Sequence, residues 1–374
     1  MRGNNVLGVI FSNMHDEKIR ELTDLRTMGS VPFGGRYRLI DFALSNMTNS
    51  GITKVGVVTK SNYRSLLDHV GSGKAWDLSR KSEGLILLPP YESGGSTRGV
   101  YNNRMEALIG IRDFLEHSQE EYVFISDTDV VCNLNVEKVV EQHINTAADV
   151  TIVYKKGKTN PASGNVTVLE NDADGTVQQV VLEEKMLDEK NINLNMYVVG
   201  RKFLLGLLSE AASRGWRNFN RDVLQANVDR FKIMGYEFTG YCGVIDSMSS
   251  YFRTNMDLLD KACRDQLFLP NRPIYTKVKD NMPARYGLGS EVKNSLIADG
   301  CVIEGKVENC ILFRGVHVAK GAEISNSIIM QGSEIGAGTR LNYVILDKNV
   351  TLRSDRTLMG FDPYPVYIRK GIMV

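Results

Sequence analysis

Cysteine and proline are scarce in this chain of 374 residues, which has five cysteines and nine prolines. No two cysteines have the C-x-x-C spacing, and no histidine lies at a spacing typical of zinc ligands. Neither a disulfide framework nor a structural zinc site is therefore indicated. We expect five reduced thiols, at Cys132, Cys242, Cys263, Cys301 and Cys310.

Long apolar runs and an excess of either charge are also missing. The first apolar run, Val6–Phe11, is too short for a secretion signal, and no stretch approaches the length that spans a membrane. There are 45 basic and 44 acidic residues, a net charge of +1, which argues against a broad basic surface for nucleic acid. We therefore expect a cytoplasmic protein with neither nucleic acid nor membrane as a partner.

Alternating strand-like and helix-like segments fill the larger, N-terminal part. Short apolar runs occur at Val6–Phe11, Ile52–Val58, Tyr122–Ile125 and Val150–Val153, and helix-like segments at Arg38–Ser50, Asn103–His117 and Val136–Ala147. This alternation predicts an α/β fold with a parallel sheet that helices cover on both faces. Ligands bind such sheets at the carboxyl ends of the strands. Ser163–Glu184 instead predicts a β-hairpin that turns at ENDADG.

A repeat appears in the C-terminal part. Asparagines recur every 15 to 17 residues, at Asn294, Asn309, Asn326 and Asn342. Six residues later come Gly300, Gly315, Gly332 and, in the fourth unit, Lys348; three further on come Ile303, Val318 and Ile335. Glycine at turns and aliphatic residues in phase predict the coils of a parallel β-helix, against the alternative of a β-sandwich with coincidental spacing. We expect domains at residues 1–262 and 290–374, joined by a linker at 263–289.

Several motifs in order resemble the glucose-1-phosphate adenylyltransferases, or ADP-glucose pyrophosphorylases. The longest is VPFGGRYRLIDFALSNMTNSGITKVGVVT at Val31–Thr59; others are Leu22–Arg26, Ser126–Asp129, Leu182–Lys185 and Tyr251–Leu259. The resemblance implies a Rossmann-like, GT-A-like nucleotidyltransferase domain followed by a left-handed parallel β-helix. It also implies a tetramer that makes ADP-glucose from ATP and glucose 1-phosphate for glycogen synthesis, with Mg²⁺ on two carboxylates.

The phosphate-binding loop departs from the family pattern A-G-G-x-G-x-R-L. The aligned stretch is SNMHDEKI, which puts Asn13, Met14 and Asp16 at the glycine positions and Lys18 at the arginine position. Met28 stands where the family has a phosphate-facing lysine. We expect the loop to be too crowded and too acidic for a triphosphate. A non-glycine residue held at positive φ there would also cost about 1 kcal/mol.

The pair of metal-binding carboxylates is incomplete as well. Asp127 matches the first carboxylate of the family, but Val244 stands at the position of the second. We expect neither a metal nor another cofactor in this chain, with Mg²⁺ confined to the catalytic homologue. The alternative is a rescued pair of Asp127 with Asp246, or with Asp129 as a ligand.

Two further sites follow from the resemblance alone. A residual sugar-phosphate pocket is expected at Asp127, Glu184, Lys185 and Asn193. An anionic effector is expected near the segment that follows FGG, where Arg36 and Arg38 supply positive charge. The alternative for these arginines is a structural salt bridge, for example with Asp41.

An intact scaffold around a degenerate site predicts a non-catalytic or weakly active regulatory subunit. Its expected partner is the catalytic subunit, in a heterotetramer, with a homo-oligomer as a further option. One alternative is an active sugar-phosphate nucleotidyltransferase with a divergent loop. Another is a sugar or acyl transferase that uses the β-helix, where His317 is the one histidine.

Overall fold

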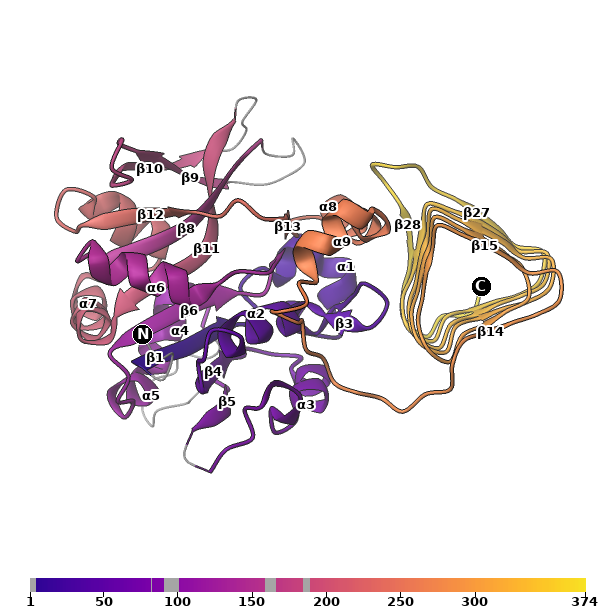
Figure 1. Cartoon of the computed structure of the whole chain (residues 1–374), viewed down its shortest axis with the longest axis horizontal. Helices are drawn as coiled ribbons and strands as arrows, with labels where there is room; N and C mark the ends of the chain where they lie inside the picture. Colours follow the sequence, from indigo (N-terminus) through magenta and orange to yellow (C-terminus); the bar gives the residue numbers. More distant parts are fainter. Residues whose placement is uncertain (1–4, 82, 91–100, 159–165, 184–188) are drawn as a thin grey trace.

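The computed structural model describes residues 5–81, 83–90, 101–158, 166–183 and 189–374. Two parts are visible in Figure 1: an α/β domain around a mixed sheet, and a triangular β-helix seen end-on. All five cysteines are free, as expected. None of the helices in the described ranges is long and apolar enough to cross a lipid bilayer.

The main sheet has the order β10-β9-β11-β6-β1-β4-β5, and β8 pairs with both β11 and β12. Its strands are β1 (Val6–Phe11), β4 (Lys54–Val58), β5 (Gly84–Leu88), β6 (Tyr122–Asp127), β8 (Val150–Gly157), β9 (Val166–Asn171), β10 (Val177–Glu183), β11 (Lys190–Gly200) and β12 (Ile233–Glu237). The predicted strands are present. The sheet is nevertheless mixed, because β11 lies antiparallel between β6 and β8. The expected hairpin is the antiparallel pair β9–β10.

Helices flank this sheet and close the domain. Their bounds are α1 (Arg20–Thr23), α2 (Leu39–Thr48), α3 (Arg64–Val70), α4 (Arg104–Gly110), α5 (Arg112–Glu116), α6 (Val136–Asn145), α7 (Arg201–Arg214), α8 (Met248–Met256) and α9 (Lys261–Leu267). Single turns are η2 (Asp16–Ile19), η3 (Met28–Ser30), η4 (Lys74–Trp76), η5 (Phe219–Leu224), η6 (Gln225–Asn227) and η7 (Asp257–Leu259). Two short pairs complete the domain: β2 (Pro32–Phe33) with β3 (Tyr37–Arg38), and β7 (Val130–Cys132) with β13 (Cys242–Val244).

Alternate side chains of β1 enter different cores. Leu7 and Val9 belong to one buried cluster, and Val6 and Ile10 belong to another. A central strand with apolar side chains on both faces is stable only between two layers, which explains its continuous apolar sequence. The parallel pairing of β1 with β6 then sets Phe11 beside Asp127. The loops that follow both strands therefore meet at one edge of the sheet.

Three sheets of five short parallel strands build the β-helix. The first comprises β14 (Arg285–Tyr286), β17 (Val302–Ile303), β20 (His317–Val318), β23 (Glu334–Ile335) and β26 (Thr351–Leu352). The second comprises β15 (Glu291–Lys293), β18 (Lys306–Glu308), β21 (Glu323–Ser325), β24 (Arg340–Asn342) and β27 (Thr357–Met359). The third comprises β16 (Leu296–Ile297), β19 (Ile311–Leu312), β22 (Ile328–Ile329), β25 (Val344–Leu346) and β28 (Val366–Ile368). This is the predicted left-handed parallel β-helix.

The repeating asparagines and glycines lie at left-handed corners. Asn294, Asn309 and Asn326 have φ of 41°, 51° and 44°, and the three repeat glycines have φ between 67° and 75°. Asparagine and glycine tolerate this conformation best. In the fourth coil the corners move on by one residue, to Tyr343 and Asn349. This shift leaves Lys348 free of the left-handed conformation that the repeat predicted for its position.

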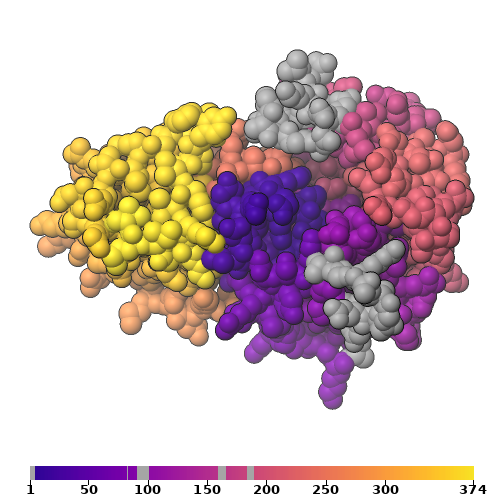
Figure 2. All heavy atoms as spheres, turned by 180° about the vertical axis from the view of Figure 1, so that it is seen from behind, coloured from indigo at the N-terminus to yellow at the C-terminus, as the bar shows by residue number. Residues whose placement is uncertain are grey.

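The β-helix packs directly on the α/β domain. One buried cluster includes Phe33 and Phe42 from the first domain together with Ile311, Ile328 and Ile345 from the β-helix. Figure 2 shows the yellow C-terminal coils pressed against the indigo N-terminal residues. The connection differs from the expected limits, since α9 runs across residue 262 and β14 already joins the β-helix at Arg285.

Candidate functional site

The loop after β1 folds back on itself at the carboxyl edge of the sheet. The Asn13 Nδ2 donates to Asp16 Oδ2 at 2.7 Å, and the backbone N–H of Met28 donates to Asp16 Oδ1 at 2.8 Å. The Asn13 Oδ1 accepts the backbone N–H of Lys60 at 2.9 Å. These bonds hold the loop through its own side chains and occupy the side-chain amide of Asn13.

Burial raises the pKa of Asp16 to about 6, while the bonds from Asn13 and Met28 act in the opposite direction. A buried carboxylate that already receives two donors repels a further anion. The expected backbone strain is absent. None of Asn13, Met14 and Asp16 has positive φ, because the chain enters the turn η2 at Asp16 instead of following a glycine-type path. The prediction of strain at these positions was wrong.

Met28 does not face the cleft. Its side chain is 1% exposed and lies in the cluster that joins the two domains, next to Ile19 and Leu22. Met14 is half-buried and packs on the core beside the sheet. Lys18 and His15 are the loop residues that line the cleft described below.

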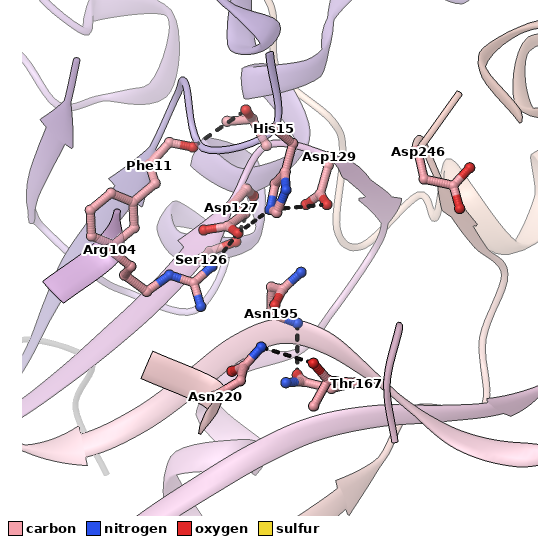
Figure 3. Close-up of polar contacts among 12 residues, drawn as sticks. Phe11, His15, Arg104, Ser126, Asp127, Asp129, Thr167, Asn195, Asn220 and Asp246 are labelled. Atoms are coloured by element: carbon pink, nitrogen blue, oxygen red, sulfur yellow. Dashed lines mark hydrogen bonds and ion pairs between the residues drawn. The ribbon is translucent and has the colours of Figure 1, made fainter. Parts of the chain in front are cut away.

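Asp127 ends β6 and is enclosed by two basic side chains (Figure 3). His15 Nε2 lies 2.6 Å from Asp127 Oδ2 and 3.3 Å from Asp129 Oδ2. Arg104 Nη2 donates to the same Asp127 Oδ2. Burial alone would raise the pKa of Asp127, but Arg104 and the hydrogen bond from His15 outweigh it and hold this pKa below its ordinary value.

Asp129 is also fully buried, and burial raises its pKa above the ordinary value. The charge of Asp127 acts in the same direction, whereas His15 opposes it. Neither carboxylate oxygen of Asp129 has a hydrogen-bond partner among the described residues, apart from the nearby His15. Among the described residues, both oxygens of Asp129 and one oxygen of Asp127, its Oδ1, therefore lack a hydrogen-bond donor.

Val244 ends β13 and lines the cleft, and Asp246 follows it. The Asp246 carboxylate accepts from Ser247 Oγ at 3.2 Å. In Figure 3 it lies apart from Asp127 and points away from it. The structure thus brings His15 and Asp129 to Asp127, rather than the Asp246 expected for a rescued metal pair.

A polar network continues from Arg104 into the cleft. Arg104 Nη1 donates to the Tyr197 hydroxyl at 3.2 Å, and that hydroxyl accepts from Asn193 Nδ2 at 2.9 Å. The same hydroxyl donates to Asn220 Oδ1 at 2.8 Å. Asn193, a predicted site residue, is therefore part of a fixed network. Glu184 and Lys185 lie outside the described residues.

The cleft itself has a volume of about 740 Å³. Its basic lining residues are His15, Lys18, Lys155, Lys156, Lys158 and Arg253, and its carboxylates are Asp129, Asp246 and Asp257. Amides line it at Asn193, Asn195 and Asn220. This volume lies within the range of small-molecule sites, and the positive charges outnumber the carboxylates. The cleft thus suits an anionic ligand that also forms hydrogen bonds.

A second, smaller pocket lies at the seam between the domains. Six basic side chains line its roughly 40 Å³, together with His69: Arg36, Arg38, Lys277, Lys279, Arg314 and Lys348. We call it the seam pocket. Among the described residues, Arg314 is the one of these six with a carboxylate within 4.0 Å, from Asp299 at 2.9 Å. Arg38 donates instead to Ser65 at 2.6 and 2.9 Å, so the expected alternative of a salt bridge with Asp41 is not what holds it.

The β-helix histidine does not form part of a comparable site. The His317 side chain is 49% exposed and lies 3.8 Å from Glu304, on the outer surface of β20. A catalytic histidine needs a partner and a bound substrate in fixed geometry, which this surface position does not supply.

The fold and the cleft together define a class: a nucleotidyl transferase domain with a hexapeptide-repeat β-helix. The family model "Nucleotidyl transferase" matches residues 8–241, and "GlmU-like, C-terminal hexapeptide" matches residues 281–365. Across the whole chain, 37% of residues are identical with glycogen biosynthesis protein GlgD of Bacillus subtilis strain 168, over 98% of that protein. GlgD of Geobacillus stearothermophilus is 39% identical over 86% of this chain and 83% of its own.

An enzyme of the same group is also similar. Glucose-1-phosphate adenylyltransferase of Clostridium perfringens strain SM101 is 32% identical over 90% of this chain and 87% of its own. The chain therefore belongs to the glucose-1-phosphate adenylyltransferase family, which includes the GlgD proteins.

Sequence reasoning missed the two residues that enclose Asp127. His15 stands inside the quoted loop SNMHDEKI, yet nothing local indicates that its ring turns towards β6. Arg104 begins α4, where a basic residue at the first turn of a helix has no electrostatic advantage. That unfavourable placement indicates that Arg104 has another role, but it does not identify Asp127 as the residue that Arg104 contacts.

Proposed function

We propose that this chain is a non-catalytic or weakly active regulatory subunit of glucose-1-phosphate adenylyltransferase, and that it supports ADP-glucose synthesis for glycogen by assembling with the catalytic subunit. One observation carries the proposal. Asp127, which matches the family's metal-binding carboxylate, is held by Arg104 and His15 inside an otherwise complete scaffold. The similarity to GlgD proteins over the whole chain supports it.

Magnitudes favour the loss of catalysis. Metal assistance contributes several kcal/mol to transition-state stabilisation, and each 1.4 kcal/mol is about tenfold in rate. The loop between Asn13 and Asp16 uses its donors internally, which removes a second contribution. Turnover by the lone chain is expected to lie several orders of magnitude below that of an active homologue.

Regulation would act through the seam pocket. We propose that an anionic effector binds there, with Arg36 and Arg38 among its contacts. Burial lowers the pKa of Lys348 to about 7, and the nearby Arg38 and Arg26 add to this shift. A cluster of cations with few carboxylates is costly unless an anion joins it. Because the pocket touches both domains, a bound anion would change how they pack.

The test is reconstitution. The chain and its catalytic homologue are purified separately and together, and ADP-glucose formation is assayed at matched concentrations of catalytic subunit. We expect a mixed complex in sedimentation, with higher activity or an altered effector response, and negligible turnover by the lone chain. Absence of a complex, or full activity of the lone chain, contradicts the proposal.

The second candidate is an active sugar-phosphate nucleotidyltransferase with a divergent loop. The cleft favours it, because its volume of about 740 Å³ is available to a ligand, and its Lys18 and Arg253 have no carboxylate within 4.0 Å among the described residues. Steady-state assay of the lone chain beside an active homologue separates the two. An active enzyme with a divergent loop has a comparable turnover rate, whereas a non-catalytic or weakly active subunit is several orders of magnitude slower.

A further inference from the structure

The metal that the family implies does not fit the environment of Asp127. Ligand atoms of His15, Asp127 and Asp129 lie within 4.8 Å of one another, close enough for one ion. However, Asp127 Oδ2 already accepts hydrogen bonds from both His15 and Arg104, which leaves Oδ1 as the one oxygen of Asp127 without a partner among the described residues. Arginine stays protonated at any ordinary pH, so an ion bound here would lie beside a buried positive charge. Mg²⁺ also prefers a near-complete shell of oxygen ligands.

Several contacts hold the Arg104 side chain beside Asp127. It is 8% exposed, and its guanidinium lies 5.3 to 6.0 Å from the ring centres of Phe11, Tyr197 and Phe219. The Tyr197 hydroxyl accepts a further bond from it. A guanidinium enclosed by aromatic rings and a carboxylate loses little by staying charged. Removing it would leave Asp127 without its main counter-charge.

The side chains that line the cleft indicate which kind of ligand binds beside Asp127 and Arg104. Asp129 is fully buried, lines the cleft and has two oxygens that lack donors, which a ligand hydroxyl would satisfy. Lys18 and Arg253 line the same cleft, and neither has a carboxylate within 4.0 Å in the described part of the chain. A ligand with hydroxyl groups and a phosphate matches both features.

We propose that Arg104 and His15 take the place of the divalent metal at Asp127, so that the cleft binds a hydroxylated phosphate ester on Asp129 without any divalent ion. This inference rests on the proposed function, in which the cleft binds a ligand but does not catalyse its reaction. Arg104 is a positioning residue here: it acts through Asp127 and does not itself line the cleft.

The first experiment measures binding of glucose 1-phosphate to the lone full-length chain by calorimetry, with EDTA and separately with Mg²⁺. We expect the same dissociation constant in both, within about twofold. Asp129→Asn should weaken glucose 1-phosphate by roughly tenfold relative to sulfate, because the sugar ester donates hydroxyl groups and sulfate has none at neutral pH. Three results would each overturn the proposal: a dissociation constant that changes tenfold or more with Mg²⁺, a ratio of the ester and sulfate dissociation constants that Asp129→Asn leaves unchanged, or no saturable binding.

The second experiment measures Mn²⁺ binding from the loss of the free-ion electron paramagnetic resonance signal. Wild type should bind none at the cleft, whereas Arg104→Gln should gain one site that glucose 1-phosphate perturbs. Arg80→Gln, which removes an arginine from an exposed ion pair with Asp77, is the matched control. Mn²⁺ binding by wild type, or a folded Arg104→Gln variant that binds none, contradicts the inference.

If Arg104→Gln does not fold, the wild-type measurements with Mn²⁺ and with EDTA still decide. Both experiments use the lone chain. A failed reconstitution with the catalytic subunit would therefore defeat the proposed function and leave these binding results unaffected.

Discussion

The cleft and the seam pocket handle buried positive charge in opposite ways. In the cleft, Arg104 forms an ion pair with Asp127, and His15 lies between Asp127 and Asp129, so the buried arginine has a carboxylate partner within the protein. In the seam pocket, six basic side chains converge with a single ion pair to a carboxylate among the described residues. The buried arginine of the first region is paired with a carboxylate, whereas five of the six basic side chains of the second have no carboxylate within 4.0 Å among the described residues.

This difference indicates where each region gets its ligand specificity. A metal-dependent site needs carboxylates that repel one another until the ion arrives. Asp127 and Asp129 still repel, since the charge of Asp127 raises the pKa of Asp129, but Arg104 offsets part of this repulsion. A site for an anionic effector needs cations that repel one another when no anion is bound, and the seam pocket gathers six basic side chains of this kind. We infer that the same fold carries one site where Arg104 takes the place of a metal and another that binds an anion.

Asp127→Asn should give the largest effect and is the sharpest test of this comparison. In an empty metal site, removing one of two neighbouring carboxylates relieves repulsion and stabilises the protein. Here the change leaves Arg104 buried without its charge partner, so we expect a loss of roughly 3–5 kcal/mol in unfolding free energy. Urea and thermal denaturation measure it, with Asp229→Asn on the exposed surface as the control. A more stable Asp127→Asn protein would break the comparison.

Asp347→Asn probes the seam next to the open pocket. Arg26 Nη2 donates to both Asp347 oxygens, at 2.8 and 2.6 Å, and joins the two domains across the chain. We expect a loss of about 2–3 kcal/mol, less than at Asp127, because water can enter a domain boundary and solvate the arginine. Faster proteolysis within residues 268–284 would report the loosened seam. Exposed Glu334→Gln in the same β-helix is the control, and equal proteolysis of the two variants would contradict the expectation.

The parts of the molecule that repeat or alternate could be predicted from the sequence. The apolar run Val6–Phe11 is a central strand, and Asn294, Asn309 and Asn326 occupy equivalent corners. In each case one local pattern determines one local conformation. The position of Asp127 at the ligand-binding edge of the sheet could also be predicted, because parallel strands bring their carboxyl ends to one edge.

The partners of Asp127 could not be predicted in the same way. Arg104 and Asp127 are 23 residues apart on different elements, and nothing local to either one encodes their contact. For Met28, the alignment instead suggested a position that the structure does not show. Its alignment with a phosphate-facing lysine suggested a side chain in the cleft, but a thioether gains more by joining the buried cluster at the seam. Contacts between distant segments require the folded packing, which motif matching does not supply.

Asp16→Asn tests whether the loop is held by its own acid. The folded pKa of Asp16 is about 6, above its ordinary value of 3.8, so the folded state holds the extra proton between these values. Stability should therefore fall as the pH rises from about 4 to about 6, by up to about 2 kcal/mol, and then level off. Asp16→Asn should flatten this part of the profile. Exposed Glu17→Gln is the control, and identical profiles for wild type and Asp16→Asn would contradict the assignment.

Lys348 gives the smallest expected effect and tests the open side of the comparison. Burial and the neighbouring arginines lower its pKa to about 7, so a bound anion should favour the protonated amine and draw a proton on binding. Sulfate is the suitable probe because it does not titrate in this range. Its affinity should rise up to roughly tenfold as the pH falls from about 8 to about 6. Calorimetry in buffers of different ionisation enthalpy measures both the affinity and the proton uptake.

The control for this measurement is Lys320→Met, which removes an exposed lysine of the same β-helix that is not among the charges acting on Lys348. Lys348→Met should abolish the pH dependence and still leave weak binding through Arg36 and Arg38, since those guanidinium groups keep their charge over the whole range. If sulfate binds wild type with no pH dependence, Lys348 does not contact the anion. If sulfate does not bind at all, the seam pocket is neutralised in some other way, and the contrast with the cleft fails.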